Sequence, residues 1–437
     1  MTLSHHKQAA VGYLDAHHDN VVGLLQQMVR TRSVNVRLDP SSAGEAEMAD
    51  LVRAEWESLG LTVEQEALEP GRPNTISEWK GVGGGPRLLF NAHVDTVAVK
   101  DGESWIDPET GETKTSWSAD PFGGELKDGY VYGRGTCDHK SPTASLVWAV
   151  RALQAAGVRL KGDLVVINDV DEETGGLAGM RHLASTRDFG VDVALFGTTT
   201  EFSPMSRRYF SAIGETNVVR AFAGMHLYRI DIRGRNYHSM TPLHGVTAVE
   251  NLAKVMPVIQ EYMAGVNAYV DPVVGTGKPP MRLMNVRTGQ RAANRPADVV
   301  ELYVNRRIDP SVDPRRAFAE LHALCDELSD PGNGLDVSVE LLREVPSNEV
   351  PAEHPLVGAL ADAIRETQGE VPTIAGIPAA TGISQMLAIQ PVPVVTFAYG
   401  TLNFHHSIDE RIPAEAVVKT AKVYAAALMD YLGVAER

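Results

Sequence analysis

The stretch from Lys161 to Gly176, KGDLVVINDVDEETGG, constrains the fold of this chain more than any other. Its first half, 164–168, is a short, largely β-branched apolar run, which is typical of a strand buried on both faces of a sheet. Asp171, Glu172 and Glu173 come where that strand should emerge. Open α/β sheets bind ligands at the carboxyl ends of their strands. Because such carboxylates repel one another, a metal is the simplest cation to hold them together, and a solvated acidic loop is the alternative for this stretch by itself.

Two further strand ends offer metal-binding side chains. The stretch 87–97, RLLFNAHVDTV, is a predicted buried strand that ends in His93 and Asp95. Side chains two residues apart on a strand share a face, and a carboxylate beside a histidine can orient the imidazole and raise its basicity. The stretch 130–140, YVYGRGTCDHK, places Asp138 after a glycine-rich turn. Three separate strand ends therefore offer histidine or carboxylate, which favours one shared site.

The composition sets limits on domain number and on partners. A chain of 437 residues is too long for one ordinary core, so two domains are expected. The formal net charge of −16 argues against nucleic acid and anionic membranes as partners. Cys137 and Cys325 cannot build a disulfide framework and are typical of a reducing compartment. With no signal sequence and no apolar run of membrane-spanning length, we expect a cytoplasmic protein.

The predicted secondary structure changes character near residue 226. The stretch 226–233, HLYRIDIR, alternates in the manner of an antiparallel strand with one solvent-exposed face. The elements expected after it are a helix at 246–264, strands at 281–286 and 299–304, a helix at 314–328 and a strand at 335–342. This β-α-β-β-α-β order indicates an inserted split βαβ domain. We therefore expect an α/β fold with a doubly wound mixed sheet over 1–223 and 344–437, and an inserted α+β domain over 224–343.

The last motif completes a resemblance to a known family. The stretch 399–413, YGTLNFHHSIDERIP, holds His405 and His406 ahead of Asp409 and Glu410. The chain carries five motifs in this order: NAHVDTV, DPFGGELKDGYVYGRGTCDHK, DEETGG, RGRNYHS and HHSIDE. Together they resemble the zinc aminoacylases, acetylornithine deacetylases, succinyl-diaminopimelate desuccinylases and glutamate carboxypeptidases. The resemblance covers nearly the whole chain.

This resemblance implies a catalytic domain, an inserted lid domain that often dimerises, and two zinc ions bridged by an aspartate. Matched position by position, His93 resembles a ligand of the first metal and Asp138 the bridge. Glu173 and His406 resemble the ligands of the second metal, and Glu172 resembles the general base. Zinc takes His nitrogen and carboxylate oxygen, and an uncoordinated carboxylate can carry the proton as water attacks an amide.

Asp95 joins the candidate catalytic residues as the partner that orients His93, because of their spacing on the strand. A further role follows from the resemblance. His238, in RGRNYHS, matches a histidine that helps stabilise the oxyanion, and a surface histidine after a strand is the alternative. His405 could be the ligand instead of His406, although the spacing to Asp409-Glu410 favours His406.

Substrate contacts are expected on the lid. Asn294 and Arg307 match positions that touch the substrate's carboxylate in similar enzymes, and Arg343 is a further candidate. Arginine suits bidentate recognition of a carboxylate. The alternative is an arginine on a solvated strand face.

Two departures from the family pattern lie near the inferred site. Relatives carry an acidic ligand of the first metal after the strand at 192–196, where this chain has Thr198. Either Glu201 restores that carboxylate or the first site is empty or weakly held, and the stretch 202–219 after Glu201 favours the weakened site. The second departure is Gly382 in AATGIS, where relatives commonly have Asp. One or two zinc ions per chain are therefore expected, with cobalt or manganese as alternatives.

The expected activity is metal-dependent hydrolysis of an amide bond in an N-acyl amino acid or small peptide, with Glu172 as general base. One alternative is an inactive family member that binds a metal or ligand, against which the retention of Glu172 argues. The other is an amidohydrolase for an amide or imide that lacks a free carboxylate. A small-molecule substrate and a homodimer formed through the lid are the expected partners.

Overall fold

The computed structural model describes residues 3–99, 102, 104–208, 210, 212–235, 245–275, 280–289, 295–379 and 381–436. The chain forms two compact units. The first comprises 1–221, 349–376 and 385–437, and the second comprises 222–348 and 377–384. The role of 224–343 as a lid or dimerisation domain stays a prediction.

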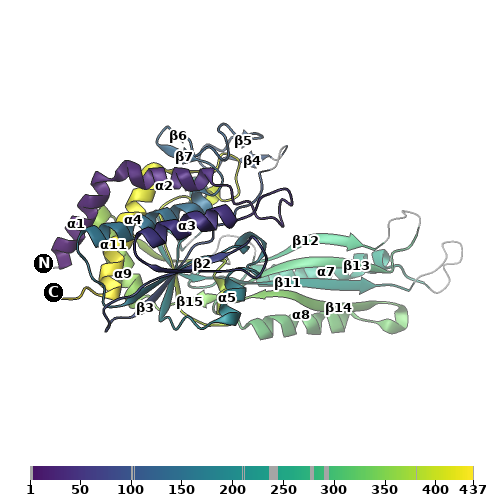
Figure 1. Ribbon diagram of the computed structural model, residues 1–437. Helices are drawn as coiled ribbons and strands as arrows, with labels where there is room; N and C mark the ends of the chain where they lie inside the picture. The colour runs from purple at the N-terminus through teal and green to yellow at the C-terminus, as the bar shows by residue number, and fades with distance from the viewer. Residues whose placement is uncertain are drawn as a thin grey trace. The chain divides into compact units, whose positions relative to one another are not determined.

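The first unit is organised around a nine-stranded mixed sheet (Figure 1). Its strands run in the order β1-β2-β8-β3-β9-β17-β10-β15, and β16 pairs with β10. In chain order they are β1 (Thr62–Glu66), β2 (Asn74–Trp79), β3 (Arg87–Asn91), β8 (Asp163–Asn168), β9 (Val193–Phe196), β10 (Asn217–Phe222), β15 (Asn348–Glu349), β16 (Thr373–Ile377) and β17 (Val394–Thr396). The centre of the sheet, β8-β3-β9-β17, is parallel. The predicted α/β class with a mixed sheet is confirmed.

Helices pack around this sheet. They are α1 (Leu3–Ala16), α2 (His18–Arg30), α3 (Ala46–Ser58), α4 (Ser141–Ala155), α5 (Met180–Thr186), α6 (Pro204–Arg207), α9 (Pro355–Gln368), α10 (Ser384–Leu387) and α11 (Ala414–Leu432). Helix α11 contacts α1, α4 and α9. Tyr424 of this helix is fully buried against Phe90 of β3, with ring centroids 5.5 Å apart. The apolar helix faces thus cover the apolar central strands, which leaves the strand ends as the polar part of the interior.

Short elements complete the first unit. They are β4 (Trp105–Ile106), β5 (Thr113–Lys114), β6 (Leu126–Lys127), β7 (Tyr130–Tyr132), β18 (Arg411–Pro413) and the single turns η1 (Thr136–Lys140), η2 (Glu172–Thr174) and η4 (Leu402–Phe404). Strand β18 pairs with β7, which ties the segment after 399–410 to the turn that carries Asp138.

The second unit has the β-α-β-β-α-β order that the sequence predicts. Its elements are β11 (Gly224–Arg233), α7 (Ala248–Asn267), β12 (Met281–Thr288), β13 (Val299–Ile308), α8 (Pro314–Leu328), η3 (Pro331–Asn333) and β14 (Asp336–Val345). The antiparallel sheet runs β12-β13-β11-β14, and α7 and α8 lie along it (Figure 1). Along β13 the side chains alternate between buried and half-buried, as a sheet with one covered face requires. None of the described helices has the length and hydropathy needed to cross a membrane.

Candidate metal centre and active site

The candidate site is built where the carboxyl ends of β8, β3 and β9 meet. These strands are parallel, and β3 lies between the other two. His93 and Asp95 follow β3, Glu172 and Glu173 follow β8, and Thr198 follows β9. The sheet therefore places at one edge several of the side chains that the sequence singled out.

The turn that carries Asp138 is held from outside by Glu410. Glu410 Oε1 accepts the backbone N–H groups of Gly135, Cys137 and Asp138 at 3.1, 2.9 and 3.2 Å. Arg134 Nη1 donates to Glu410 Oε2 at 2.7 Å. Both charged side chains are buried. Glu410 thus fixes the backbone beneath Asp138, a role that the sequence analysis did not assign to it.

Asp138, Glu173 and His406 form one group of potential metal ligands, with ligand atoms all within 4.8 Å of one another. His406 Nε2 lies 3.0 Å from both Asp138 Oδ2 and Glu173 Oε2. The backbone φ of His406 is 62°, an unfavourable value for a residue other than glycine and one that recurs at functional sites. His405 Nδ1 lies 3.3 Å from Asp138 Oδ2, while its Nε2 contacts Thr199 Oγ1 at 2.8 Å, and His405 is not in this group.

His93, Asp138 and His139 form a second group. Asp138 Oδ1 lies 3.3 Å from His93 Nε2 and 2.9 Å from His139 Nε2. The two oxygens of Asp138 therefore face different groups, which is the arrangement of a bridging carboxylate. The sequence analysis quoted His139 within its motif without assigning it a role.

The donors in these groups suit metal ions. His93 Nε2 and Glu173 Oε1 are buried and lack a hydrogen-bond partner in the described part of the chain. Since buried polar atoms are nearly always bonded, two such atoms in one cluster indicate a missing partner. Imidazole nitrogen and carboxylate oxygen are ligands that zinc takes.

Glu172 lies beside these donors but in neither group. Its Oε2 is 3.8 Å from His93 Nε2. Asp95 positions this segment, because its carboxylate accepts the backbone N–H groups of Glu172 and Glu173 at 3.1 and 3.2 Å. Asp95 is itself held by Asn35 Nδ2 at 2.8 Å. The arrangement leaves one carboxylate free to exchange a proton next to the donor cluster.

The site perturbs the pKa values of its members. Burial, together with the neighbouring carboxylates, raises the pKa of Glu172 to about 8 and that of Glu173 to about 7. Burial opposes protonation of His93, but the charges of Glu172, Asp138 and Asp95 outweigh it and raise its pKa well above the usual value. Burial and the nearby His93 lower the pKa of His139 to about 3, so its imidazole is neutral. Such a cluster of shifted groups is typical of active sites.

Glu201 contributes to neither ligand group. Its Oε2 accepts the backbone N–H of Gly400 at 2.9 Å, and its own N–H donates to the Gly400 carbonyl at 3.1 Å. Thr198 Oγ1 instead contacts His139 Nε2. Among the described residues, Glu201 therefore does not lie with the other potential metal ligands.

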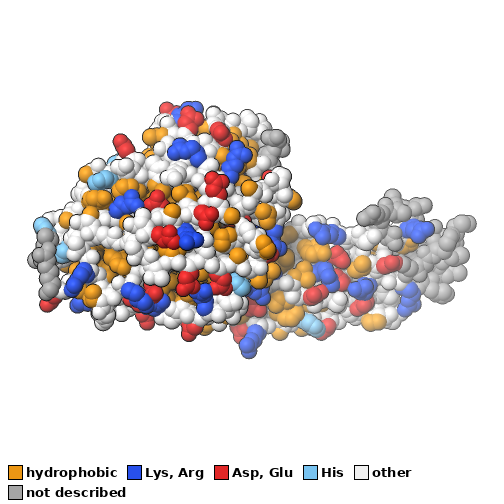
Figure 2. Space-filling view, viewed as in Figure 1, with side chains coloured by type: hydrophobic (Ala, Val, Ile, Leu, Met, Phe, Trp, Pro, Cys, Tyr) orange, Lys and Arg blue, Asp and Glu red, His pale blue; other side chains and the backbone are white. Residues whose placement is uncertain are grey.

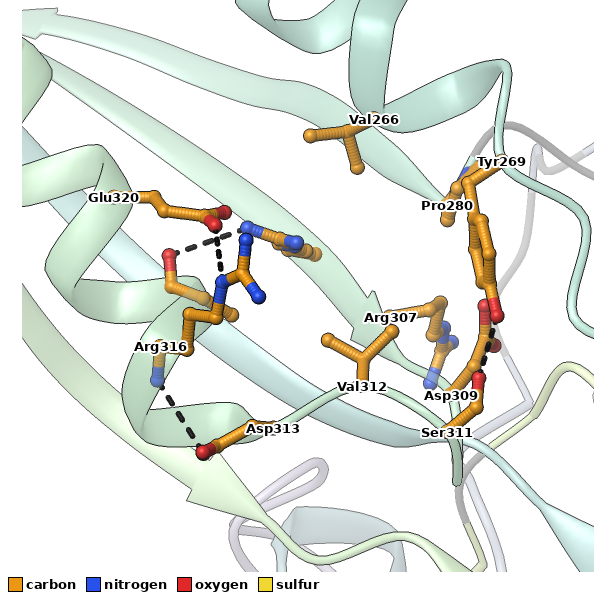
Figure 3. Close-up of a pocket in the computed structure, with 12 residues that line it drawn as sticks. Val266, Tyr269, Pro280, Arg307, Asp309, Ser311, Val312, Asp313, Arg316 and Glu320 are labelled. Atoms are coloured by element: carbon orange, nitrogen blue, oxygen red, sulfur yellow. Dashed lines mark hydrogen bonds and ion pairs between the residues drawn. The ribbon is translucent and has the colours of Figure 1, made fainter.

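The structure describes only two of the four second-unit residues expected to contact the substrate or the oxyanion. His238 and Asn294 lie outside the described residues. Arg307 lines a pocket of about 410 Å³ in the second unit, whose wall also includes Tyr269 and Asp309 (Figure 3). Burial lowers the pKa of Arg307, and no carboxylate among the described residues forms an ion pair with it. Arg343 is exposed on β14.

Comparisons with known proteins agree with this geometry. Residues 89–430 match the profile of peptidase family M20/M25/M40. An acetylornithine deacetylase of Vibrio campbellii (strain ATCC BAA-1116) is 26% identical over 407 residues, which cover 92% of this chain and 96% of that protein. The dipeptidase Dug1p of Saccharomyces cerevisiae has a similar structure, with a TM-score of 0.69 at 16% identity over 98% of this chain and 99% of that one. The Bacillus subtilis YXEP protein, a dinuclear metal binding peptidase from the M20 family, gives a TM-score of 0.65 at 16% identity over 96% and 99% of the two chains. A match over most of the chain, on the residues that build this site, shows that the protein belongs to peptidase family M20/M25/M40.

Proposed function

We propose that this member of the family is a zinc-dependent enzyme that hydrolyses the amide bond of N-acyl amino acids or small peptides, with Glu172 as its general base. One observation carries the proposal. Two groups of metal ligands share Asp138, and an uncoordinated carboxylate, Glu172, lies beside them. Histidine and carboxylate donors support zinc as the metal.

The residues divide the work. His93 and Asp138 would hold one metal, and Asp138, Glu173 and His406 the other. When bound, such metal ions polarise a carbonyl oxygen and lower the pKa of water toward ~7. Glu172 takes the proton of the attacking water and then delivers it to the leaving amine.

We assign the remaining contacts to the second unit. His238 stabilises the oxyanion, and Asn294, Arg307 and Arg343 contact the carboxylate of the substrate. The half-buried guanidinium of Arg307 supports this assignment, because it lines a pocket and has no ion-pair partner among the described residues (Figure 3). A carboxylate accepts two parallel hydrogen bonds from such a group.

We further propose a cytoplasmic homodimer, joined through 224–343, that acts on small molecules and not on nucleic acid or membranes. Both cysteines are free and buried, in keeping with a reducing compartment. The net charge is −16, and on the face drawn in Figure 2 the Lys and Arg side chains are interspersed with Asp and Glu. A surface of this kind does not attract polyanions.

The test is incubation of zinc-loaded and cobalt-loaded protein with a mixed panel of N-acyl amino acids and dipeptides, with products identified by mass spectrometry. We expect cleavage of at least one amide class, loss of cleavage after chelation, and recovery when metal is restored. Cleavage that survives complete removal of metal would contradict the proposal. So would a fully metal-loaded protein that leaves the whole panel intact.

A further inference from the structure

The position that should complete the first metal site carries Thr198, but a different side chain fills the space. Thr198 follows β9 and is buried, and its Oγ1 contacts Nε2 of His139. His139 is only 4% exposed, and it follows Asp138 directly in the chain. An imidazole therefore occupies the place next to His93 and Asp138 where a carboxylate is missing.

We propose that His139 replaces the missing carboxylate and binds the first metal together with His93 and Asp138. This inference rests on the proposed function, since it names the ligands of one of its two metals. It gives that site a nitrogen-rich ligand set with a single negative charge, which it shares with the second site.

Distances among the donors support a common ion. Zinc at ~2.0–2.1 Å from each of its tetrahedral ligands separates those ligands by ~3.3 Å. His93 Nε2 lies 3.3 Å, and His139 Nε2 2.9 Å, from Asp138 Oδ1. All the donor atoms of this group lie within 4.8 Å of one another. A small adjustment of side chains would therefore place one metal between them.

The surroundings of the His93 ring support a cation at this place. His93 Nδ1 lies 3.0 Å from the carbonyl oxygen of Asp95, so Nδ1 carries the proton of this bond and Nε2 is the nitrogen available to a metal. That Nε2 is buried and lacks a hydrogen bond within the described residues. A buried ring nitrogen that has no hydrogen bond and faces other potential ligands is satisfied when a metal takes the place of its proton.

The competing candidate is held elsewhere. Glu201 uses Oε2 to accept the backbone N–H of Gly400 at 2.9 Å, and it is absent from both ligand groups. Recruiting Glu201 would break this hydrogen bond and move the side chain toward the site. Recruiting His139 would give up its contact with Thr198, but its Nε2 already lies 2.9 Å from Asp138 Oδ1. The remaining interpretation is a purely structural histidine, held by its contacts with Thr198 and Asp138, and a count of bound metal distinguishes the two.

The exchange of carboxylate for imidazole also changes metal preference. Imidazole suits zinc and cobalt, while carboxylate-rich sites suit manganese and magnesium. We therefore expect the first site to bind Zn²⁺ and Co²⁺ and to discriminate against Mn²⁺ more strongly than the site of Asp138, Glu173 and His406.

The experiment measures metal per chain by elemental analysis of dialysed protein, and the absorption spectrum of Co²⁺-loaded protein, in the full-length wild type and in variants. We expect near two metals per chain in the wild type and in Glu201→Ala, and near one in His139→Ala with loss of part of the cobalt spectrum. His139→Gln is the second variant, and circular dichroism verifies that each is folded. In His139→Ala, adding Thr198→Asp should restore the second metal by returning a carboxylate.

Near two metals in folded His139→Ala or His139→Gln would overturn the inference, and so would near one metal in the wild type that neither substitution changes. These outcomes are separate from the failure of the proposed function. A wild type with two metals, one of them dependent on His139, that cleaves no amide would leave the ligand assignment intact. If cleavage depends on Glu172 but metal content is the same with and without His139, the proposed function stands and the ligand assignment fails.

Discussion

Asp95 Oδ1 accepts the backbone N–H of Glu172 at 3.1 Å. This bond joins the segment after β3 to the segment after β8, so the residue that neighbours the His93 ring also sets the place of the proposed base. Asp95 is fully buried, and Asn35 donates to its other oxygen at 2.8 Å. It therefore acts on the chemistry by positioning, through His93 and Glu172.

Replacing Asp95 with Asn keeps the size of the side chain. It puts an N–H donor where the backbone N–H groups of Glu172 and Glu173 need an acceptor. We expect Asp95→Asn to weaken metal binding by roughly 10–100-fold, the usual loss when a partner behind a ligand is removed. Competition with a chelator measures the affinity, and the exposed Asp188→Asn serves as the control. Unchanged affinity in Asp95→Asn would show that the carboxylate does not support the ligands.

His238 is assigned to the oxyanion from its motif alone. If that role is correct, His238→Ala lowers kcat by on the order of 10²-fold with little change in KM, because the contact strengthens only in the transition state. Steady-state kinetics separate the two constants. A rise in KM with unchanged kcat would make His238 a residue that binds the substrate's ground state.

Arg307 is expected to bind the carboxylate of the substrate. Loss of a charge-assisted hydrogen bond costs about 1.5–3 kcal/mol, so Arg307→Gln should raise KM by roughly 10–100-fold. Arg282→Gln, on the exposed side of β12, is the matched control. The effect should vanish for a substrate amide that lacks a free carboxylate. An equal loss for both substrate types would remove Arg307 from carboxylate recognition.

The buried ion pair of Asp107 and Arg411 allows a test of folding stability that does not involve the proposed catalytic residues. Arg411 Nη1 donates to Asp107 Oδ2 at 2.9 Å. Burial raises the pKa of Asp107, but this bond and the backbone N–H groups of Thr110 and Glu109 outweigh it, so the pKa lies below the usual 3.8. A depressed carboxyl pKa stabilises the folded state above the unfolded-state value, and this contribution is lost as the pH falls through the folded-state pKa.

Asp107→Asn should therefore lower the free energy of unfolding at pH 7 by about 1.5–3 kcal/mol, since it removes one of the two carboxylates that pair with the buried Arg411 and leaves only Glu109. Urea denaturation measures the difference. The gap between variant and wild type should narrow below about pH 4, where the wild type loses the same charge. A gap that is constant from pH 7 to pH 3 would show that the charge of Asp107 does not contribute.

The sequence predicted best those elements whose apolar pattern is strong. Strand β8 and the order of elements in the second unit follow from period and composition, because their buried faces leave a clear hydrophobic signal. Strand β1, TVEQE, gave no such signal, since it is mostly polar and lies at the edge of the sheet. The segment 377–384 joins the second unit by contacts that no local pattern records.

The same contrast holds within the site. The sequence could predict that His93, Glu172 and Glu173 lie close together, because strand ends in an α/β sheet converge. His139 and Glu410 were missed because their roles depend on side-chain direction and on contacts with distant segments. The bonds from Gly135, Cys137 and Asp138 to Glu410 span more than 270 positions along the chain. The histidine directly after Asp138, in a chain that lacks the acidic ligand, was the available signal.

The most direct test of the whole account is the turnover of Glu172→Gln, measured on a substrate found in the panel and on samples whose metal content is determined. We predict that kcat falls by roughly 10²–10⁴-fold, because a carboxamide cannot carry the proton, while metal per chain stays at the wild-type level. Loss of metal together with activity would make Glu172 a ligand. A variant with wild-type metal content and wild-type kcat would contradict the account, because the proton would then move without Glu172.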